Sequence, residues 1–168
     1  MKQRVCEIMD KLLIVLIGLP GSGKSTWRDD FLSKTDKEFV IISSDDEIES
    51  LCKAEGLTYT DGFDKFVGRA TMIIKQKFKE AVNTGKNVIW DQTNMSVKKR
   101  RGILQKVPEG YRCEAVSFEV TLEELNSRLT KREAETGKHI PPFVIKSMAN
   151  SYVPPTKSEG FDKVTIVK

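Results

Sequence analysis

A glycine-rich stretch near the start of the chain has the residue types that bind phosphate groups. Residues 18–26 read GLPGSGKST, and they fit the pattern G-x-x-x-x-G-K-[ST] between an apolar run and a helical pattern. Glycines let successive backbone N–H groups turn toward phosphate oxygens, and the following helix directs its positive end at the same anion. The residues of this predicted nucleotide site are Gly18, Pro20, Gly21, Ser22, Gly23, Lys24, Ser25 and Thr26.

Two side chains of this loop are predicted to have chemical roles. The Lys24 ammonium group is expected to contact the β- and γ-phosphates, and the Ser25 hydroxyl is expected to ligate Mg²⁺. The predicted cofactors are therefore ATP, or another nucleoside triphosphate, and Mg²⁺. The alternative, a glycine-rich turn followed by a chance Lys-Ser pair, conflicts with the strand and helix patterns on either side.

Carboxylates follow two further apolar runs. Asp45 lies in VIISSDDE and Asp91 in NVIWDQTN. Because the carboxyl ends of parallel strands face the ligand crevice, both should look toward the γ-phosphate. Asp45 is then a candidate base for an acceptor hydroxyl; the alternative, an acidic first turn of a helix, applies more strongly to Asp46. For Asp91 the spacing leaves two roles open, binding the acceptor or holding Mg²⁺-bound water.

Arginines in the second half of the chain are candidates for phosphate contacts. Arg128 and Arg132 are four residues apart and share one helix face, so they could cover the triphosphate as a lid or form a solvated charged face. Arg100 and Arg101 belong to KKRR, residues 98–101. That run is expected either to contact a nucleic-acid backbone or to be a solvated helix face.

Apolar runs that alternate with helical patterns predict an α/β fold with a parallel sheet of about five strands flanked by helices. Together with the glycine-rich loop and the helix that carries Arg128 and Arg132, this pattern predicts a P-loop kinase-like fold with a helical lid. Gly85 and Thr121 have the positions of a helix stop and a helix start. Residues 152–162 form a proline-bearing loop in which we expect no helix. The predicted strands cover 12–17, 39–43, 87–90, 113–119 and 163–167, and the helices 24–33, 63–83, 96–106, 121–135 and 141–150.

Length and composition limit the class of protein. The 168 residues favour one domain, 1–168, with residues 1–11 as an N-terminal extension. No apolar run approaches 18 residues, so we expect no membrane-spanning helix. Three unpaired cysteines indicate reduced thiols in a cytoplasm rather than a disulfide framework. The net charge is +4, and residues 91–168 carry the whole excess with 14 basic against 10 acidic side chains, which is compatible with an anionic partner.

The ordered set GLPGSGKSTW, SDD, DQTN, RR, REAETGKHIP and PTKSEGF resembles the 5′-hydroxyl polynucleotide kinases of phage and animals, and it spans Leu12 to Lys168. The resemblance implies that Asp45 activates the 5′-hydroxyl and that Arg132 is the lid arginine. It also implies a location in the cytoplasm, which for a phage-encoded chain is that of the host. The implied acceptor-binding residues are Asp45, Asp91, Thr93, Asn94, Arg100 and Arg101.

The implied reaction is transfer of the ATP γ-phosphate to the 5′-hydroxyl of DNA or RNA, as in nucleic-acid repair, with the nucleic-acid end as partner. The chain departs from the family pattern at Ser44, Ile48 and Thr136, so the resemblance does not fix the acceptor. One alternative is the same chemistry on a small molecule or a tRNA-linked amino acid. Another is a nucleotide-dependent regulatory ATPase that has no phosphoryl acceptor. The oligomeric state is left open.

Overall fold

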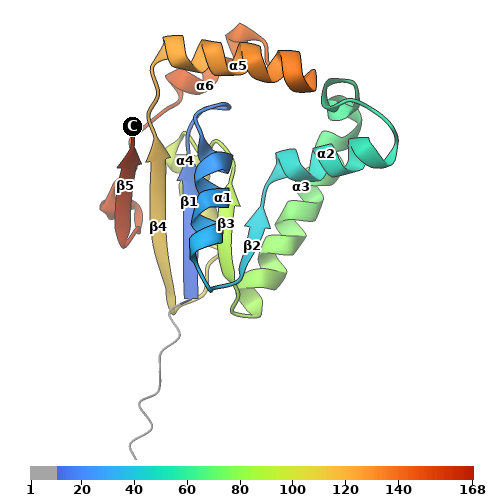
Figure 1. Ribbon diagram of the computed structural model, residues 1–168. Coiled ribbons are helices and arrows are strands. Elements are labelled where there is room, and N and C mark those ends of the chain that lie inside the picture. Colours follow the sequence, from blue (N-terminus) through green and yellow to red (C-terminus); the bar gives the residue numbers. More distant parts are fainter. Residues whose placement is uncertain (1–10) are drawn as a thin grey trace, which may run out of the picture.

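A single parallel sheet organises the described part of the chain, residues 11–168 of the computed structural model. Its strand order is β2-β3-β1-β4-β5 (Figure 1). The strands are β1 (Lys11–Ile17), β2 (Phe39–Ile42), β3 (Asn87–Asp91), β4 (Tyr111–Phe118) and β5 (Lys163–Val167). The helices are α1 (Lys24–Lys34), α2 (Ser44–Ala54), α3 (Tyr59–Asn83), α4 (Val97–Leu104), α5 (Leu122–Thr136) and α6 (Pro142–Asn150), with one 3₁₀ turn, η1 (Lys157–Glu159).

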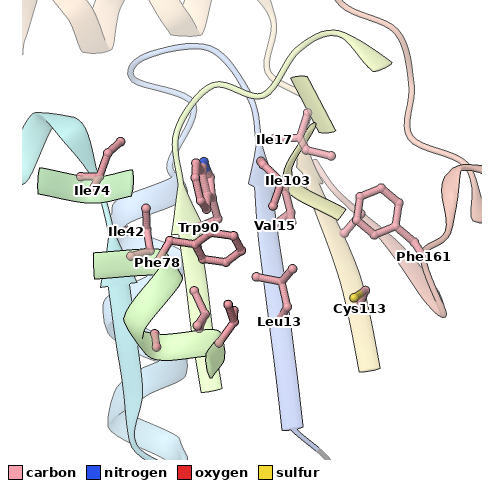
Figure 2. Close-up of a cluster of buried hydrophobic side chains, with 14 of the residues drawn as sticks. Leu13, Val15, Ile17, Ile42, Ile74, Phe78, Trp90, Ile103, Cys113 and Phe161 are labelled. Atoms are coloured by element: carbon pink, nitrogen blue, oxygen red, sulfur yellow. The ribbon is translucent and has the colours of Figure 1, made fainter. Parts of the chain in front are cut away.

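Both faces of the central strand β1 are buried, which explains why it is an uninterrupted apolar run. One face of β1 packs with α3 and α4, and Figure 2 shows Leu13, Val15 and Ile17 in this cluster, where the Phe78 and Trp90 rings meet edge to face. The opposite face of the sheet packs against apolar side chains of α1. The result is a three-layer arrangement in which the sheet holds the strand ends in place.

The carboxyl ends of the strands meet at one edge of the sheet. β1 lies between β3 and β4, with Val15 paired to Trp90 on one side and Ala115 on the other. The glycine-rich loop follows β1, α2 follows β2, and Asp91 ends β3. Helices α5 and α6 lie across this edge (Figure 1). The predicted parallel α/β fold is confirmed, and all five predicted strands and five predicted helices are present within a few residues of the expected bounds.

The sequence interpretation missed two elements. Helix α2 begins at Ser44 with Ser43 as its cap, where the side chain accepts a hydrogen bond from the Asp46 backbone N–H. The expectation of no helix in residues 152–162 is wrong for one turn, because η1 occupies Lys157–Glu159. Both predicted signals hold: Gly85 has a φ of 69°, and the Thr121 side chain caps α5.

Two further expectations concern membrane-spanning helices and the state of the cysteines. None of the helices within residues 11–168 is long and apolar enough to cross a bilayer. Cys52 and Cys113 are both buried and free, and burial with the nearby Asp162 raises the pKa of the Cys113 thiol to about 11. The predicted N-terminal extension, with Cys6, lies outside the described residues except for Lys11, which begins β1.

Candidate phosphoryl-transfer site

The glycine-rich loop has the backbone shape that phosphate binding needs. Gly21 and Gly23 have φ values of 80° and 100°, which side-chain-bearing residues rarely adopt, and Gly23 is the N-cap of α1. A Cβ at Gly18 would lie 2.5 Å from Ser22 Oγ and 3.1 Å from Phe118 Cβ, so a larger residue here would displace the Ser22 side chain. Within residues 11–168, that Ser22 hydroxyl is the one buried side-chain polar atom without a hydrogen-bond partner. The loop therefore has a polar group available for a ligand.

The Lys24 side chain folds back onto the glycine-rich loop. Its ammonium group donates to the carbonyl oxygens of Gly18 and Leu19, both at 2.9 Å. Burial lowers the pKa of Lys24 to about 8, although the carboxylates of Asp91 and Asp45 act in the opposite direction. A bound triphosphate would favour the charged form of the lysine, so we expect phosphate binding and protonation of Lys24 to be linked.

The residues next to Lys24 fit a nucleotide with its metal ion. Ser25 is exposed in the first turn of α1 and lines the same cleft as Lys24 and Asp45. Mg²⁺ usually takes few protein ligands and completes its shell with phosphate oxygens and water. The Ser25 hydroxyl is therefore placed to be one ligand of the ion beside a bound triphosphate, where Mg²⁺ would neutralise phosphate charge.

Asp91 is buried at the end of β3 and pairs with an arginine that the sequence interpretation missed. The Arg28 guanidinium donates to Asp91 Oδ2 at 2.8 Å and to Asp46 Oδ2 at 3.0 Å. Burial raises the pKa of the Asp91 carboxyl, although the charges of Lys24 and Arg28 partly offset it. Arg28 lies four residues after Lys24, so its helical spacing was a signal that it shares a face with that lysine.

Asp45 lies in the first turn of α2, and two neighbours occupy its carboxylate oxygens. The Tyr59 hydroxyl donates to Oδ1 at 2.7 Å, and the Lys138 ammonium group donates to Oδ2 at 3.1 Å. Burial alone would raise the pKa of Asp45, but Lys138, Tyr59 and the charge of Arg132 together hold it below its usual value. Asp45 is therefore an ionised carboxylate with fixed orientation, half exposed to the cleft.

Helix α5 lies over the loop in the manner expected of a lid. A Cβ at Gly21 would lie 3.1 Å from the Leu129 side chain, so α5 packs directly on the loop. Arg128 donates to the Gly21 carbonyl oxygen at 3.3 Å and pairs with Glu124. Arg132 lines the cleft, and among residues 11–168 no side chain or backbone group forms a hydrogen bond or ion pair with its guanidinium. Both predicted lid arginines thus face the cleft.

Thr93 and Asn94 line the cleft, but the fold also uses them. The Gly18 N–H donates to the Thr93 carbonyl oxygen at 3.0 Å, and Asn94 Nδ2 donates to the Leu16 carbonyl oxygen at 2.8 Å. Asn94 has a φ of 47°, a left-handed conformation that asparagine tolerates better than most residues. These bonds tie the end of β3 to the start of the glycine-rich loop, so Asn94 has a structural role whether or not it touches an acceptor.

The predicted contact of Arg100 with an acceptor is wrong. Its side chain is 0% exposed, and it forms a two-bond ion pair with Glu159 at 2.8 and 3.1 Å. It also donates to the carbonyl oxygens of Asn94 and Met95, both at 3.0 Å. Arg100 therefore holds η1 against α4. The RR motif, through Arg100, and the PTKSEGF motif, through Glu159, form one buried ion pair. Arg101 is exposed but does not line the cleft.

Lysines on α4 and just after its end, rather than these arginines, border the cleft. Lys98, Lys99 and Lys106 are exposed and line it, and none of them forms an ion pair with a residue in 11–168. Helix α3 contributes the aromatic pair Tyr59 and Phe63, whose ring centroids are 5.7 Å apart, to the lining of the same cleft. The cleft therefore has basic and aromatic side chains in its lining as well as the glycine-rich loop and Asp45.

This loop, sheet and lid define a nucleotide-binding P-loop protein with a kinase-like fold. The chain belongs to the AAA_33 family, described as an AAA domain, whose sequence model matches residues 13–155. The chain is similar to L-seryl-tRNA(Sec) kinase of Methanococcus maripaludis, with 28% identity over 90% of the chain and 56% of that protein. It is also 25% identical to human heterogeneous nuclear ribonucleoprotein U-like protein 2, over 95% of the chain and 21% of that protein. The chain thus spans about half or less of these relatives.

Solved structures agree with the kinase-like fold. A chain of the Pnkp1/Rnl/Hen1 RNA repair complex superposes with a TM-score of 0.67 and 28% identity, over 84% of this chain and 44% of that one. A chain of the PezAT toxin–antitoxin system of Streptococcus pneumoniae has a TM-score of 0.74 at 17% identity, over 95% of this chain and 68% of that one. A gluconokinase of Sinorhizobium meliloti 1021 has a TM-score of 0.54 at 17% identity, covering 92% and 80%.

Proposed function

We propose that this protein is a polynucleotide 5′-hydroxyl kinase that moves the γ-phosphate of ATP to the 5′-OH of DNA or RNA. The observation that carries the proposal is the shared cleft, in which the loop around Lys24, the ionised Asp45 and the Arg132 guanidinium, which has no partner within residues 11–168, face the same space. The likeness to the RNA repair complex, at 28% identity, supports an acceptor of this kind.

The proposed reaction divides the work among these residues. Lys24 and the loop amides hold the β- and γ-phosphates, and Mg²⁺ held at Ser25 would neutralise phosphate charge. Asp45 accepts the proton of the attacking 5′-hydroxyl as that oxygen bonds to the γ-phosphorus and the bond to the β-phosphate oxygen breaks. Arg132 and Arg128 stabilise the charge on the transferring group. The products are a 5′-phosphorylated end and ADP.

A second candidate is transfer to a tRNA-linked amino acid. It is favoured by the 28% identity to L-seryl-tRNA(Sec) kinase over 90% of the chain. The two acceptors are chemically related, because a 5′-hydroxyl and a serine hydroxyl are both primary alcohols carried by a polynucleotide. A basic groove along Lys98, Lys99 and Lys106 would suit either one.

The acceptor can be identified directly with ATP labelled at the γ-phosphate. We expect label on a 5′-OH oligonucleotide, and none on the same oligonucleotide with a 5′-phosphate, on gluconate or on other sugars. Asp45→Asn should lower kcat by about 10²-fold while the KM for ATP changes little, because the variant keeps the shape but loses the base.

The other outcomes of this assay assign the rival functions. Label on seryl-tRNA alone would establish the second candidate. Release of phosphate to water at a rate that no acceptor changes would show a nucleotide hydrolase and would refute the kinase proposal.

The groove predicts how salt affects acceptor binding. We expect the combined variant Lys98→Gln, Lys99→Gln and Lys106→Gln to flatten the plot of log affinity against log salt for a single-stranded oligonucleotide. The slope should change by about 0.7 for each phosphate that a lysine no longer neutralises, or about 2 in total. Fluorescence titration at several salt concentrations measures it. Arg101→Gln is the control, since that side chain is exposed on the same helix outside the cleft. An equal effect of Arg101→Gln would contradict the placement of the acceptor along these lysines.

A further inference from the structure

Lys138 is a buried ammonium group to which the proposed reaction gives no step of its own. Its side chain is 2% exposed, and it contacts Asp45 Oδ2 at 3.1 Å and Glu49 Oε1 at 3.4 Å. Its ammonium group also lies 3.8 Å from the centre of the Tyr59 ring. Lysine is rarely buried unless it is paired. Here one ammonium group meets two carboxylates and an aromatic face at the position of the proposed base.

The chain around Lys138 is docked onto α2 and α3 at the end of the lid. The Thr60 hydroxyl donates to the Gly137 carbonyl oxygen at 2.7 Å, and the His139 N–H donates to the same hydroxyl at 3.4 Å. Gly137 ends α5 with a φ of 69°, and this turn directs the chain from the lid toward α3. Figure 1 shows the end of α5 beside the turn between α2 and α3. Lys138 therefore joins the lid to the acceptor side of the cleft.

We propose that Lys138 is a positioning residue that orients the Asp45 carboxylate when the end of α5 is docked, so that lid closure and the placement of the base are coupled. This inference rests on the proposed role of Asp45. Arg132 lies near the end of α5, six residues before Lys138, and Lys138 follows the end of that helix. When the end of α5 docks, Arg132 is placed to contact the transferring phosphate and Lys138 is placed to contact Asp45.

The surroundings of Asp45 make Lys138 the decisive contact. Within residues 11–168 the Asp45 carboxylate oxygens accept side-chain hydrogen bonds only from the Tyr59 hydroxyl and from the Lys138 ammonium group. Lys24 from α1 and Arg132 from α5 add positive charge at longer range. The carboxylates of Asp91 from β3 and of Asp46 and Glu49 from α2 act against this positive charge. The His139 imidazole pairs with Glu133. Without Lys138, Asp45 would face these carboxylates with a single hydrogen bond from Tyr59.

Two substitutions separate positioning from simple packing. Lys138→Met keeps the length and the apolar stem but removes the charge, whereas Lys138→Arg keeps the charge. Lys131→Met is the matched control, because Lys131 is an exposed lysine on α5. For each variant we would measure kcat against pH with a 5′-OH oligonucleotide, the KM for ATP and the melting temperature. The ¹³C-carboxyl signal of Asp45, assigned with Asp45→Asn, would be titrated in the absence of acceptor.

Lys138→Met should lower kcat at pH 7 by about tenfold or more, as a misplaced catalytic group does, with the KM for ATP little changed. Only the ionised Asp45 can accept a proton, and loss of the lysine raises its pKa, so the acid limb of kcat should move to higher pH. The carboxyl titration should move in the same direction. Lys138→Arg should keep most of the wild-type kcat and a carboxyl titration close to that of the wild type. Lys131→Met should match the wild type in both measurements.

Two results would overturn the inference. One is an unchanged Asp45 titration in Lys138→Met. The other is a loss of kcat that is equal at every pH and accompanied by a lower melting temperature, which marks a purely structural lysine. If the wild type transfers nothing to a 5′-OH end, the proposed function fails instead. The carboxyl titration still decides the role of Lys138 in that case, because it needs no acceptor.

Discussion

Lys24→Ala is expected to lower phosphoryl transfer by about 10³-fold or more, the largest loss among the substitutions considered. The reason is the position of its ammonium group, which donates to the Gly18 and Leu19 carbonyl oxygens at the floor of the loop. From there we expect it to reach phosphate oxygens that gain charge as the bond to the γ-phosphorus breaks. Turnover of labelled ATP with a 5′-OH oligonucleotide measures the loss.

The same substitution should not destabilise the fold. Burial lowers the pKa of Lys24 to about 8 from an ordinary value of 10.5, so the charged lysine costs stability in the unliganded protein. That cost is fully present below pH 8 and disappears as the pH rises toward 10.5. Lys24→Ala removes it, so the melting temperature at pH 7 should stay the same or rise.

The exposed Lys34 on the same helix provides the control, and Lys34→Ala should leave turnover unchanged. Retained turnover in Lys24→Ala, or an unfolded variant, would contradict this assignment.

Arg132→Ala should lower kcat by about 10²- to 10³-fold with a smaller change in the KM for ATP. Arg132 lines the cleft, and no group within residues 11–168 pairs with its guanidinium, so its charge is available to a ligand. A clamp on the transferring phosphate acts mainly in the transition state, which is why the effect should appear in kcat. Steady-state kinetics with ATP and a saturating acceptor separates the two constants.

Lysine at position 132 should restore only part of the rate, because it lacks the two-pronged geometry of the guanidinium. Arg69→Ala is the control, since Arg69 is exposed on α3 and lies outside the cleft. Equal rates for arginine, lysine and alanine at position 132 would place this side chain in solvent instead of over the phosphate.

Most of the fold could be predicted from the sequence because its signals are local. The LLIVLI run before the glycine-rich loop predicted a strand at 12–17, and β1 lies there with both of its faces buried. Helix α2 was also signalled, by Ser43 followed by acidic residues and by apolar Ile48 and Cys52 four residues apart. It was missed because a capped acidic turn was weighed only as the alternative to a catalytic role, whereas the structure accommodates a helix with Asp45 facing the cleft.

The candidate site was predicted in part, for the same physical reason. Asp91 ends β3, and Lys24 and Asp45 lie in the first turns of the helices that follow β1 and β2, so the parallel strands bring all three together at one edge. Arg28 carried a weaker signal, its spacing from Lys24. Lys138 carried none, because its partners Asp45 and Glu49 lie about 90 residues earlier in the chain and meet it only when α5 docks on α2.

The sequence by itself determined the P-loop, the parallel sheet and the edge at which the chemistry lies, because backbone geometry and apolar periodicity are properties of short segments. Only the tertiary structure decided which charged side chains serve the cleft and which serve the fold. Arg100 and Lys98 are neighbours in one basic run, yet Arg100 is buried against Glu159 while Lys98 is exposed at the cleft. A charge is assigned to solvent, ligand or ion pair by what packs against it, and those partners come from distant parts of the chain.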